Sequence, residues 1–353
     1  MNQKINNIQG LRAFAAIAVV SFHTGLILPH MRAIGSFGVD VFFVISGYIM
    51  ARICETNSSF FLRRRLIRIV PPYWVMTALL FLAALKSPQL MGATRASGPE
   101  LLKSLLFIPY FKSNGLLRPL LFVGWSLNYE MFFYLAIALG LLLYRRHALL
   151  LASAVVLATA ALCHGRPGAL PVFYGNGIMI EFVLGIAAYE IARRVPESFA
   201  LRTRPGWLAV TLLCMGGLIC QQGIDRPELS YDWIVTESLC MILILSASLL
   251  SRGGWDLRVA WLVLIGDASY ILYLIHPYCE YSIDRLFTWR FHHLNMRHPA
   301  GSLFVSALSI VVAVLIHVYV ERPTVAALNA RFGGKRRSSE FRAPQTVPEQ
   351  VAP

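Results

Sequence analysis

Long apolar runs separated by short polar segments dominate the chain. A helix that crosses a bilayer needs about 20 mainly apolar residues, and many of the runs come close to this length. Membrane β-barrels show shorter segments of alternating polarity, so the continuous runs favour helices, which pair their own backbone groups. The pattern predicts an all-α integral membrane protein, a bundle of about ten transmembrane helices with the spans 9–28, 36–53, 71–86, 121–143, 148–163, 171–192, 207–222, 232–250, 259–279 and 301–320.

The composition agrees with lipid as the solvent of this chain. Of its 353 residues, 57% are hydrophobic and 14% are charged, whereas a soluble domain carries about 25% charged residues. The first apolar stretch lacks a small-residue cleavage site, so it is predicted to be a retained span and not a signal peptide. We expect one transmembrane domain, 1–330, with an interfacial helix in the loop 87–120, and a disordered basic and Pro-rich tail, 331–353.

Positive charge predicts the orientation. About two-thirds of the 32 Lys and Arg residues fall on one side if both termini are cytoplasmic, as the positive-inside rule requires. The bias supports an even number of spans with both termini in the cytoplasm, and we expect a multi-pass protein of the inner (plasma) membrane. The net charge of +14 is explained by these loops, so nucleic acid is not expected as a partner.

Arg12 and His23 lie on one face of the first span. Their separation of eleven residues is about 20° more than three helical turns and about 16 Å along the axis. A cation at the cytoplasmic mouth with an imidazole deeper on the same face suits an anionic cofactor that reaches inward. The alternative is a snorkelling Arg and a packed, hydrogen-bonded His.

Four ionisable residues from four spans share a depth in the outer half of the membrane. Ionisable groups inside spans are costly and are functional candidates by default. His23, Asp40, Glu130 and His276 are therefore predicted to form a catalytic group, in which Asp40 or Glu130 orients the His23 imidazole. A helix cap is the alternative for Asp40.

An Arg-rich segment, 60–73, precedes the third span and is predicted to form a cytoplasmic interfacial helix. It fits an anchor for anionic lipid or a collar for phosphate, in which Arg65 and Arg68 bind the ligand. The two interpretations are compatible.

No metal site is predicted. His317 and Glu321 are an i,i+4 pair, which a local ion pair explains. The histidines 292, 293 and 298 have no Cys or carboxylate to complete a ligand set, and the six cysteines lack the spacing of metal ligands.

Together these motifs resemble the acyltransferase-3 family of polytopic membrane acyltransferases. The matching features are Arg12 and His23 with ten residues between them, and the segments 38–47, 65–68, 125–130, 269–276 and 321–323. They occur in the family's order and cover residues 8 to about 323. Within the family the chain is similar to the short bacterial exopolysaccharide O-acetyltransferases.

The resemblance implies an O-acetyltransferase that moves an acetyl group from cytosolic acyl-CoA to a hydroxyl of a lipid-linked or exported glycan. Acyl-CoA is then a co-substrate and no cofactor is bound tightly. Arg12, Arg65 and Arg68 would hold the CoA phosphates, and the motif residues Trp125, Ser269 and Tyr270 would bind substrate. The bilayer and a polysaccharide-synthesis machinery are the further partners implied.

Two other functions fit the same composition. A glycan or lipid transporter, or flippase, would use intramembrane charges to line a pathway, but the chain lacks a repeated pair of broken helices. A scaffold for a polysaccharide synthase would tolerate replacement of His23 and Arg12. The acceptor, the acyl group, the choice between direct transfer and an acyl-enzyme, and the oligomeric state stay open.

Overall fold

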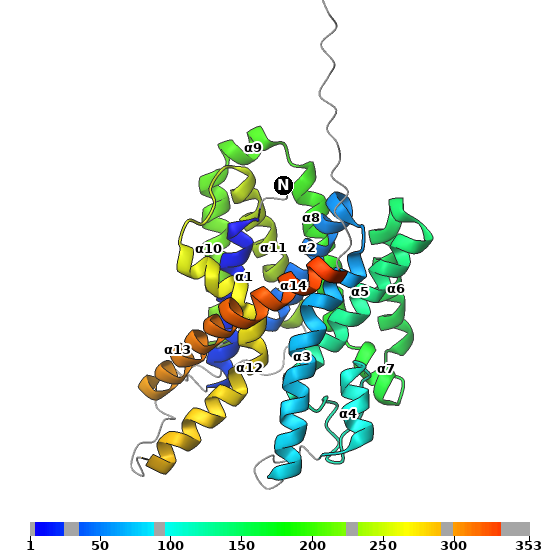
Figure 1. Ribbon diagram of the computed structural model, residues 1–353. Coiled ribbons are helices and arrows are strands. Elements are labelled where there is room, and N and C mark those ends of the chain that lie inside the picture. The colour runs from blue at the N-terminus through cyan, green and yellow to red at the C-terminus, as the bar shows by residue number, and fades with distance from the viewer. Residues whose placement is uncertain (1–3, 25–34, 88–95, 224–231, 291–298, 333–353) are drawn as a thin grey trace, which may run out of the picture.

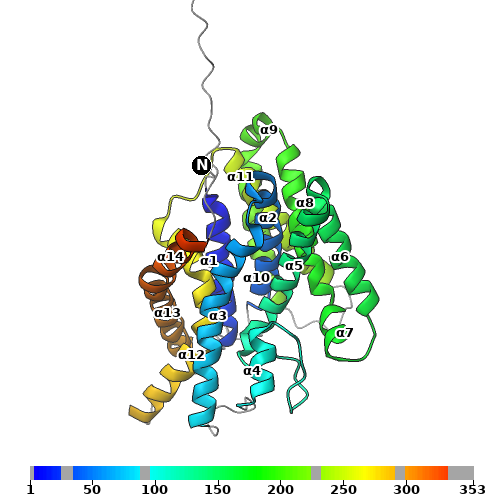
Figure 2. The ribbon, with the colours of Figure 1, turned by 45° about the vertical axis from the view of Figure 1, so that its right-hand side comes forward.

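The computed structural model describes residues 4–24, 35–87, 96–223, 232–290 and 299–332. Within these ranges the regular structure is helical, apart from one isolated antiparallel bridge between Phe111 and Leu117. The predicted all-α class is therefore confirmed. Most helices run roughly along one direction and form a bundle, as two views of the ribbon show (Figure 1, Figure 2). From residue 333 on, the predicted tail lies outside the described residues.

Six helical segments in the described part are long and apolar enough to cross a membrane. They are Phe61–Lys86, Phe122–Leu143, Arg145–Cys163, Trp233–Arg252, Ala260–Ile283 and Ala300–Phe332. Helices also occupy the other predicted spans, but these helices are shorter or more polar: α1 (Asn6–His23), α2 (Gly38–Asn57), α8 (Ile180–Arg194) and α10 (Arg204–Gly223). The protein is thus a multi-pass membrane protein with at least six long apolar helices.

The predicted span 171–192 is wrong as a continuous helix. It is divided into α7 (Ala169–Tyr174), a short 3₁₀ turn (Gly177–Met179) and α8. The break falls between Gly175 and Gly177, where Asn176 accepts a hydrogen bond from the backbone of Ile178 at 3.0 Å. Glycine and an Asn cap favour a helix boundary. The boundary was missed because the residues on both sides are apolar and together resemble one continuous span.

The Arg-rich segment is also not a separate interfacial helix. It forms the first turns of α3 (Phe61–Lys86), which continues through Pro71 and Pro72 into the predicted third span. The Tyr270 hydroxyl donates to the Ile69 carbonyl at 2.6 Å, beside these prolines, so α12 (Ala260–Arg290) contacts α3 where its backbone bonding is interrupted. The loop 87–120 does contain a helix, α4 (Gly98–Leu105).

The last two predicted spans end differently from the expectation. Helix α12 extends past 279 to Arg290 and includes Pro277. Helix α13 (Pro299–Ile316) continues through a π-helical turn, His317–Glu321, into α14 (Arg322–Phe332), which lies across the bundle near α3 (Figure 1). Such π-helical turns within helices frequently occur at functional sites.

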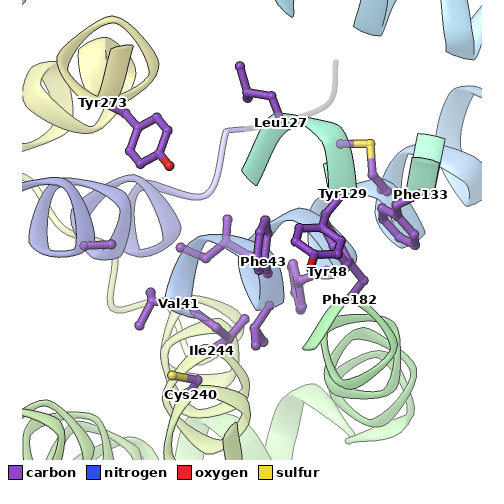
Figure 3. Packing of buried hydrophobic residues seen from close by; sticks show 14 of the residues in the cluster. Val41, Phe43, Tyr48, Leu127, Tyr129, Phe133, Phe182, Cys240, Ile244 and Tyr273 are labelled. Atoms are coloured by element: carbon purple, nitrogen blue, oxygen red, sulfur yellow. The ribbon is translucent and has the colours of Figure 1, made fainter. Parts of the chain in front are cut away.

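Helix α2 is the centre of the core. Its buried Phe43 packs on Phe182 of α8 and Tyr129 of α5 (Trp125–Leu143), with ring centroids 4.7 and 6.1 Å apart, and residues of α11 (Asp232–Arg252) lie on another side (Figure 3). Gly47 and Gly185 let α2 and α8 approach closely, since a Cβ on Gly47 would lie 2.1 Å from the carbonyl oxygen of Phe182. Small residues of this kind are typical of packed membrane helices. The remaining helices of the bundle are α6 (Ala148–Cys163) and the short α9 (Glu197–Arg202).

We expect Gly47→Ala to destabilise the bundle by about 1–3 kcal/mol, the usual cost of overpacking, because the added methyl group meets backbone and not a movable side chain. The thermal unfolding midpoint in detergent measures the effect. Gly216→Ala is the matched control, since a Cβ at this helical position of α10 has no neighbour within 4 Å. Equal midpoints for the two variants would contradict this account of the α2–α8 contact.

Candidate active site

A cavity of about 100 Å³ lies inside the bundle, among α1, α2, α3, α5 and α12. Apolar side chains of α2, such as Phe42 and Ile45, form much of its wall. Six of the predicted site residues line it: Arg12, Arg65, Arg68, Glu130, Ser269 and Tyr270. The structure thus brings together the three predicted phosphate-binding arginines, although they come from two helices.

Hydrogen bonds hold one of these arginines, Arg12, in place. Arg12 donates through Nε and Nη2 to the hydroxyl of Ser269, at 3.2 and 2.9 Å, and so ties α1 to α12. The buried Nε of Arg65 has no hydrogen-bond partner among the described residues. A buried donor without a partner is costly, so this guanidinium is available to a ligand.

Glu130 lies with the arginines and not with His23. Its carboxylate accepts a hydrogen bond from Ser46 at 3.2 Å and another from the hydroxyl of Tyr134, and it interacts electrostatically with Arg12 and Arg65. Three guanidinium groups and one carboxylate line the cavity, so a net positive charge remains for an anionic ligand. The interpretation of Glu130 as an orienting base does not fit these contacts.

His23 and His276 form a direct pair. Nε2 of His276 lies 3.2 Å from Nδ1 of His23, and the ring centroids are 4.8 Å apart. His276 is fully buried in α12, whereas His23 ends α1 and is exposed. The two residues that were predicted from separate spans therefore meet as a dyad.

The contacts of this dyad define the neutral tautomers. Nδ1 of His276 faces the carbonyl oxygens of Leu272 and Tyr273 at 3.1 and 2.8 Å, so it must carry a proton and donate. Its Nε2 is then an acceptor, and Nδ1 of His23, which also faces the Val19 carbonyl at 2.9 Å, must be the donor. The lone pair of His23 is left on Nε2, where a base or nucleophile needs it.

Tyr273 and Ser126 lie between the arginine cavity and the histidine dyad. Both line the cavity, and their hydroxyls are 2.7 Å apart. The Tyr273 hydroxyl also donates to the Val123 carbonyl at 2.9 Å, and its ring centroid is 6.0 Å from that of His276. Sequence reasoning missed these residues, although each lies within a motif, and Tyr273 shares a helix face with Ser269 and His276.

Asp40 belongs to a different group. It does not line the cavity, and its carboxyl group shares a hydrogen bond with Glu181, close to Glu237. The described contacts of the His23 ring are with His276, the Val19 carbonyl, Phe22 and Phe122, and not with Asp40. The prediction that Asp40 orients His23 therefore does not fit the structure. Asp40 lies in the first turn of α2, and its side chain packs toward α8 and α11.

Trp125 lies beside the site without lining the cavity. The Arg118 guanidinium is 5.0 Å above its ring, and the charge of Arg118 also acts on His23. Arg118 is exposed, so sequence reasoning had no signal that separated it from other loop arginines.

The predicted local pair of His317 and Glu321 is present, with Nδ1 and Oε2 2.6 Å apart. Among the described residues no group of three or more His, Cys, Asp or Glu side chains is arranged to hold a metal ion. The histidines 292, 293 and 298 lie outside the described residues.

Comparison with known families identifies the class of protein. The model of the acyltransferase domain of the acyltransferase-3 family matches residues 5–318, which contain both the arginine cavity and the histidine dyad. The chain belongs to this family and is a membrane acyltransferase, as the motifs predicted.

Similar curated proteins cover nearly the whole chain. The chain is 31% identical to the exopolysaccharide production protein ExoZ of Rhizobium meliloti, over 88% of this chain and 96% of ExoZ. It is 26% identical to the acyltransferase MdmB of Streptomyces mycarofaciens, over 93% of each protein. It is 31% identical to the putative membrane-bound transacylase BcsY of Komagataeibacter xylinus, over 90% of this chain and 82% of BcsY. No solved structure shows a significant match.

Proposed function

We propose that this enzyme transfers an acetyl group from cytosolic acyl-CoA to a hydroxyl of an exported or lipid-linked glycan. The observation that carries the proposal is the arrangement of the arginine cavity, the Tyr273–Ser126 pair and the histidine dyad along α1 and α12. The name of ExoZ refers to exopolysaccharide production, which supports a polysaccharide acceptor and its synthesis machinery as the partner.

The arginine cavity is the proposed donor site. Guanidinium groups bind phosphate in a bidentate manner, so Arg12, Arg65 and Arg68 would hold the CoA phosphates. Arg12 and His23 lie about 16 Å apart along α1, a distance that an extended pantetheine arm has to cover. The thioester would then pass Tyr273 and reach the dyad.

The proposed chemistry uses the lone pair on Nε2 of His23. It takes the proton of the sugar hydroxyl, and the hydroxyl oxygen attacks the thioester carbonyl carbon. The C–S bond breaks, and the CoA thiolate takes the proton back from the imidazolium, so the products are an O-acyl ester and free CoA. The Tyr273 hydroxyl donates to the Val123 carbonyl in the free enzyme, and in the proposed mechanism it turns from this carbonyl to donate to the developing oxyanion.

An acyl-His23 intermediate is the second form of this mechanism, in which Nε2 attacks the thioester carbonyl carbon and the C–S bond breaks to release the CoA thiolate. The sugar hydroxyl then attacks the acyl carbon, the bond to Nε2 breaks, and the thiolate takes up the hydroxyl proton. Purified protein incubated with radiolabelled acetyl-CoA and no acceptor distinguishes the two forms. Label retained on wild type but not on His23→Ala supports the covalent route, and no retained label supports direct transfer.

The proposed topology has ten spans in the inner membrane with both termini in the cytoplasm. The start of α1, with its arginine, then faces the cytosolic donor, and its other end, with His23, faces the exported acceptor. Reporter fusions after Arg145 and Arg194 should give a cytoplasmic signal, and an exoplasmic signal from both would overturn the topology.

The test of the function is acetyl-CoA-dependent labelling of the glycan by purified protein in vesicles. A transporter or flippase needs no acyl donor, so labelling that requires both donor and protein supports transfer. Glycan movement without labelling would instead support the transporter.

Removal of a cavity arginine is expected to weaken donor binding. A charged hydrogen bond contributes about 1.5–3 kcal/mol, so Arg65→Gln and Arg12→Gln should each raise the KM for acetyl-CoA about ten- to hundredfold, with a smaller effect on kcat. Arg63→Gln is the matched control, because Arg63 is exposed and lies over the Phe60 ring, at 4.5 Å, outside the cavity. An unchanged KM in both cavity variants would refute the phosphate role.

A further inference from the structure

A second hollow lies on the opposite side of α1 from the arginine cavity. It is a groove of about 330 Å³ between α1 and α10, with α11 as its floor. Its lining is almost entirely apolar and includes Leu11, Phe14, Ile17, Met215 and Leu262. More than half of them are partly exposed, so the groove is open at the surface of the bundle.

The groove has the dimensions of one hydrocarbon chain in one leaflet. Its lining runs along α1 from Asn7 to Ile17, ten residues or about 15 Å at 1.5 Å per residue. The hydrocarbon core of a bilayer is about 30 Å thick, so the groove spans about half of it. A polyprenyl chain is several times longer than the groove and would not fit within it.

The end of the groove at Asn7 is rigid. The Asn7 amide donates to the carbonyls of Ala247 and Trp255 at 3.2 and 2.7 Å and accepts from the backbone of Leu257 at 2.8 Å. A Cβ on Gly10 would lie 2.6 Å from the side chain of Leu257. The loop between α11 and α12 therefore packs directly against α1. The rim of the groove is therefore preorganised.

This rim carries an interfacial aromatic residue and positive charge. The guanidinium of Arg204 lies 5.1 Å above the ring of Trp255, which is 39% exposed. The exposed Arg258 follows the lining residue Leu257. The nearby carboxylate of Asp256 accepts a hydrogen bond from Ser251 at 2.5 Å. Tryptophan marks the headgroup level of a membrane, and arginines at that level attract anionic lipid.

We infer that this groove binds one acyl chain of an anionic glycerophospholipid, whose phosphate contacts Arg204 and Arg258. The site is separate from the proposed donor site, and the inference does not depend on acyl transfer. The lipid fills the space between α1 and α10, which both pack on α11, and thus supports the helix that carries Arg12 and His23.

Native mass spectrometry of the purified protein tests the inference. The protein is equilibrated with equimolar phosphatidylglycerol and phosphatidylethanolamine in mild detergent. Wild-type protein should retain one molecule of phosphatidylglycerol in preference to phosphatidylethanolamine. Met215→Trp fills the groove and should lower its occupancy about tenfold, since each buried methylene strengthens binding about fourfold.

Two further variants keep the test independent of folding defects. Leu213→Trp is the control, because Leu213 is 73% exposed on the same helix and does not line the groove. It should retain lipid as wild type does. Arg204→Gln with Arg258→Gln should still retain lipid but lower the phosphatidylglycerol preference about tenfold. Equal retention by wild type and Met215→Trp, no retained lipid, or stronger retention of added polyprenyl phosphate would overturn the inference.

Discussion

His23→Gln is expected to abolish acyl transfer, with kcat lower by about 10²–10⁴, the usual contribution of a positioned general base. Glutamine can still donate a hydrogen bond to the Val19 carbonyl, which Nδ1 of His23 contacts at 2.9 Å, but it has no basic nitrogen in place of Nε2. Because His23 is exposed at the end of α1, its replacement should leave the fold intact. Acetyl-CoA-dependent labelling of the glycan measures the loss.

The control for this variant is His164→Gln, since His164 is also exposed and lies at the end of α6, away from the cavity. Both variants should be expressed equally and unfold at the same temperature. Glycan labelling by His23→Gln at a rate within a few-fold of His164→Gln would refute the proposed role of His23.

His276→Leu is also expected to lower kcat, although His276 is not proposed to touch the substrate. Without the acceptor Nε2, the 3.2 Å contact to Nδ1 of His23 is lost, and the Val19 carbonyl at 2.9 Å is the described hydrogen-bond partner that this nitrogen keeps. The His23 ring is then held less firmly in the orientation and tautomer that catalysis needs. Loss of the partner that holds the tautomer in a catalytic triad costs about 10⁴ in kcat. Because the Val19 carbonyl still accepts from Nδ1 of His23, we expect a smaller loss here, about 10- to 100-fold. The KM for acetyl-CoA should change little, because the arginine cavity is intact.

His276→Gln distinguishes a positioning role from a structural one. The side-chain carbonyl of the glutamine can reach the position of Nε2 and accept a hydrogen bond from His23. The kcat of His276→Gln should therefore be up to about tenfold higher than that of His276→Leu. A purely structural role predicts that stability and activity fall together in both variants. Equal activity of the two variants at equal stability would therefore contradict the tautomer argument.

The sequence predicted the class of fold because hydrophobicity is a property of each segment alone. The long apolar runs gave the membrane helices, and the motifs gave the acyltransferase family. Boundaries were less certain where breakers and apolar residues are mixed. The break at Gly175 to Gly177 was missed, whereas the Arg-rich segment 60–73 was predicted as an interfacial helix before the span 71–86, although α3 contains both without a break.

The candidate site was predicted in part for a similar reason. Residue spacing fixes depth and face within one helix, so Arg12 and His23 were correctly placed on α1. Spacing does not say which neighbouring helix a face meets. Asp40, Glu130 and His276 share similar depths with His23 in the prediction, yet of these only His276 contacts it in the described part of the chain.

The sequence by itself thus determined that this protein is a helical membrane acyltransferase with arginines and histidines as its candidate chemistry. The tertiary structure alone decided how they are grouped. Close contacts such as that between Gly47 and Gly185 set the rotation of α2 against α8, and this packing directs Asp40 toward Glu181 and leaves the dyad to His23 and His276. The physical reason is that helix rotation depends on the packing of all neighbours at once, which no single apolar segment encodes.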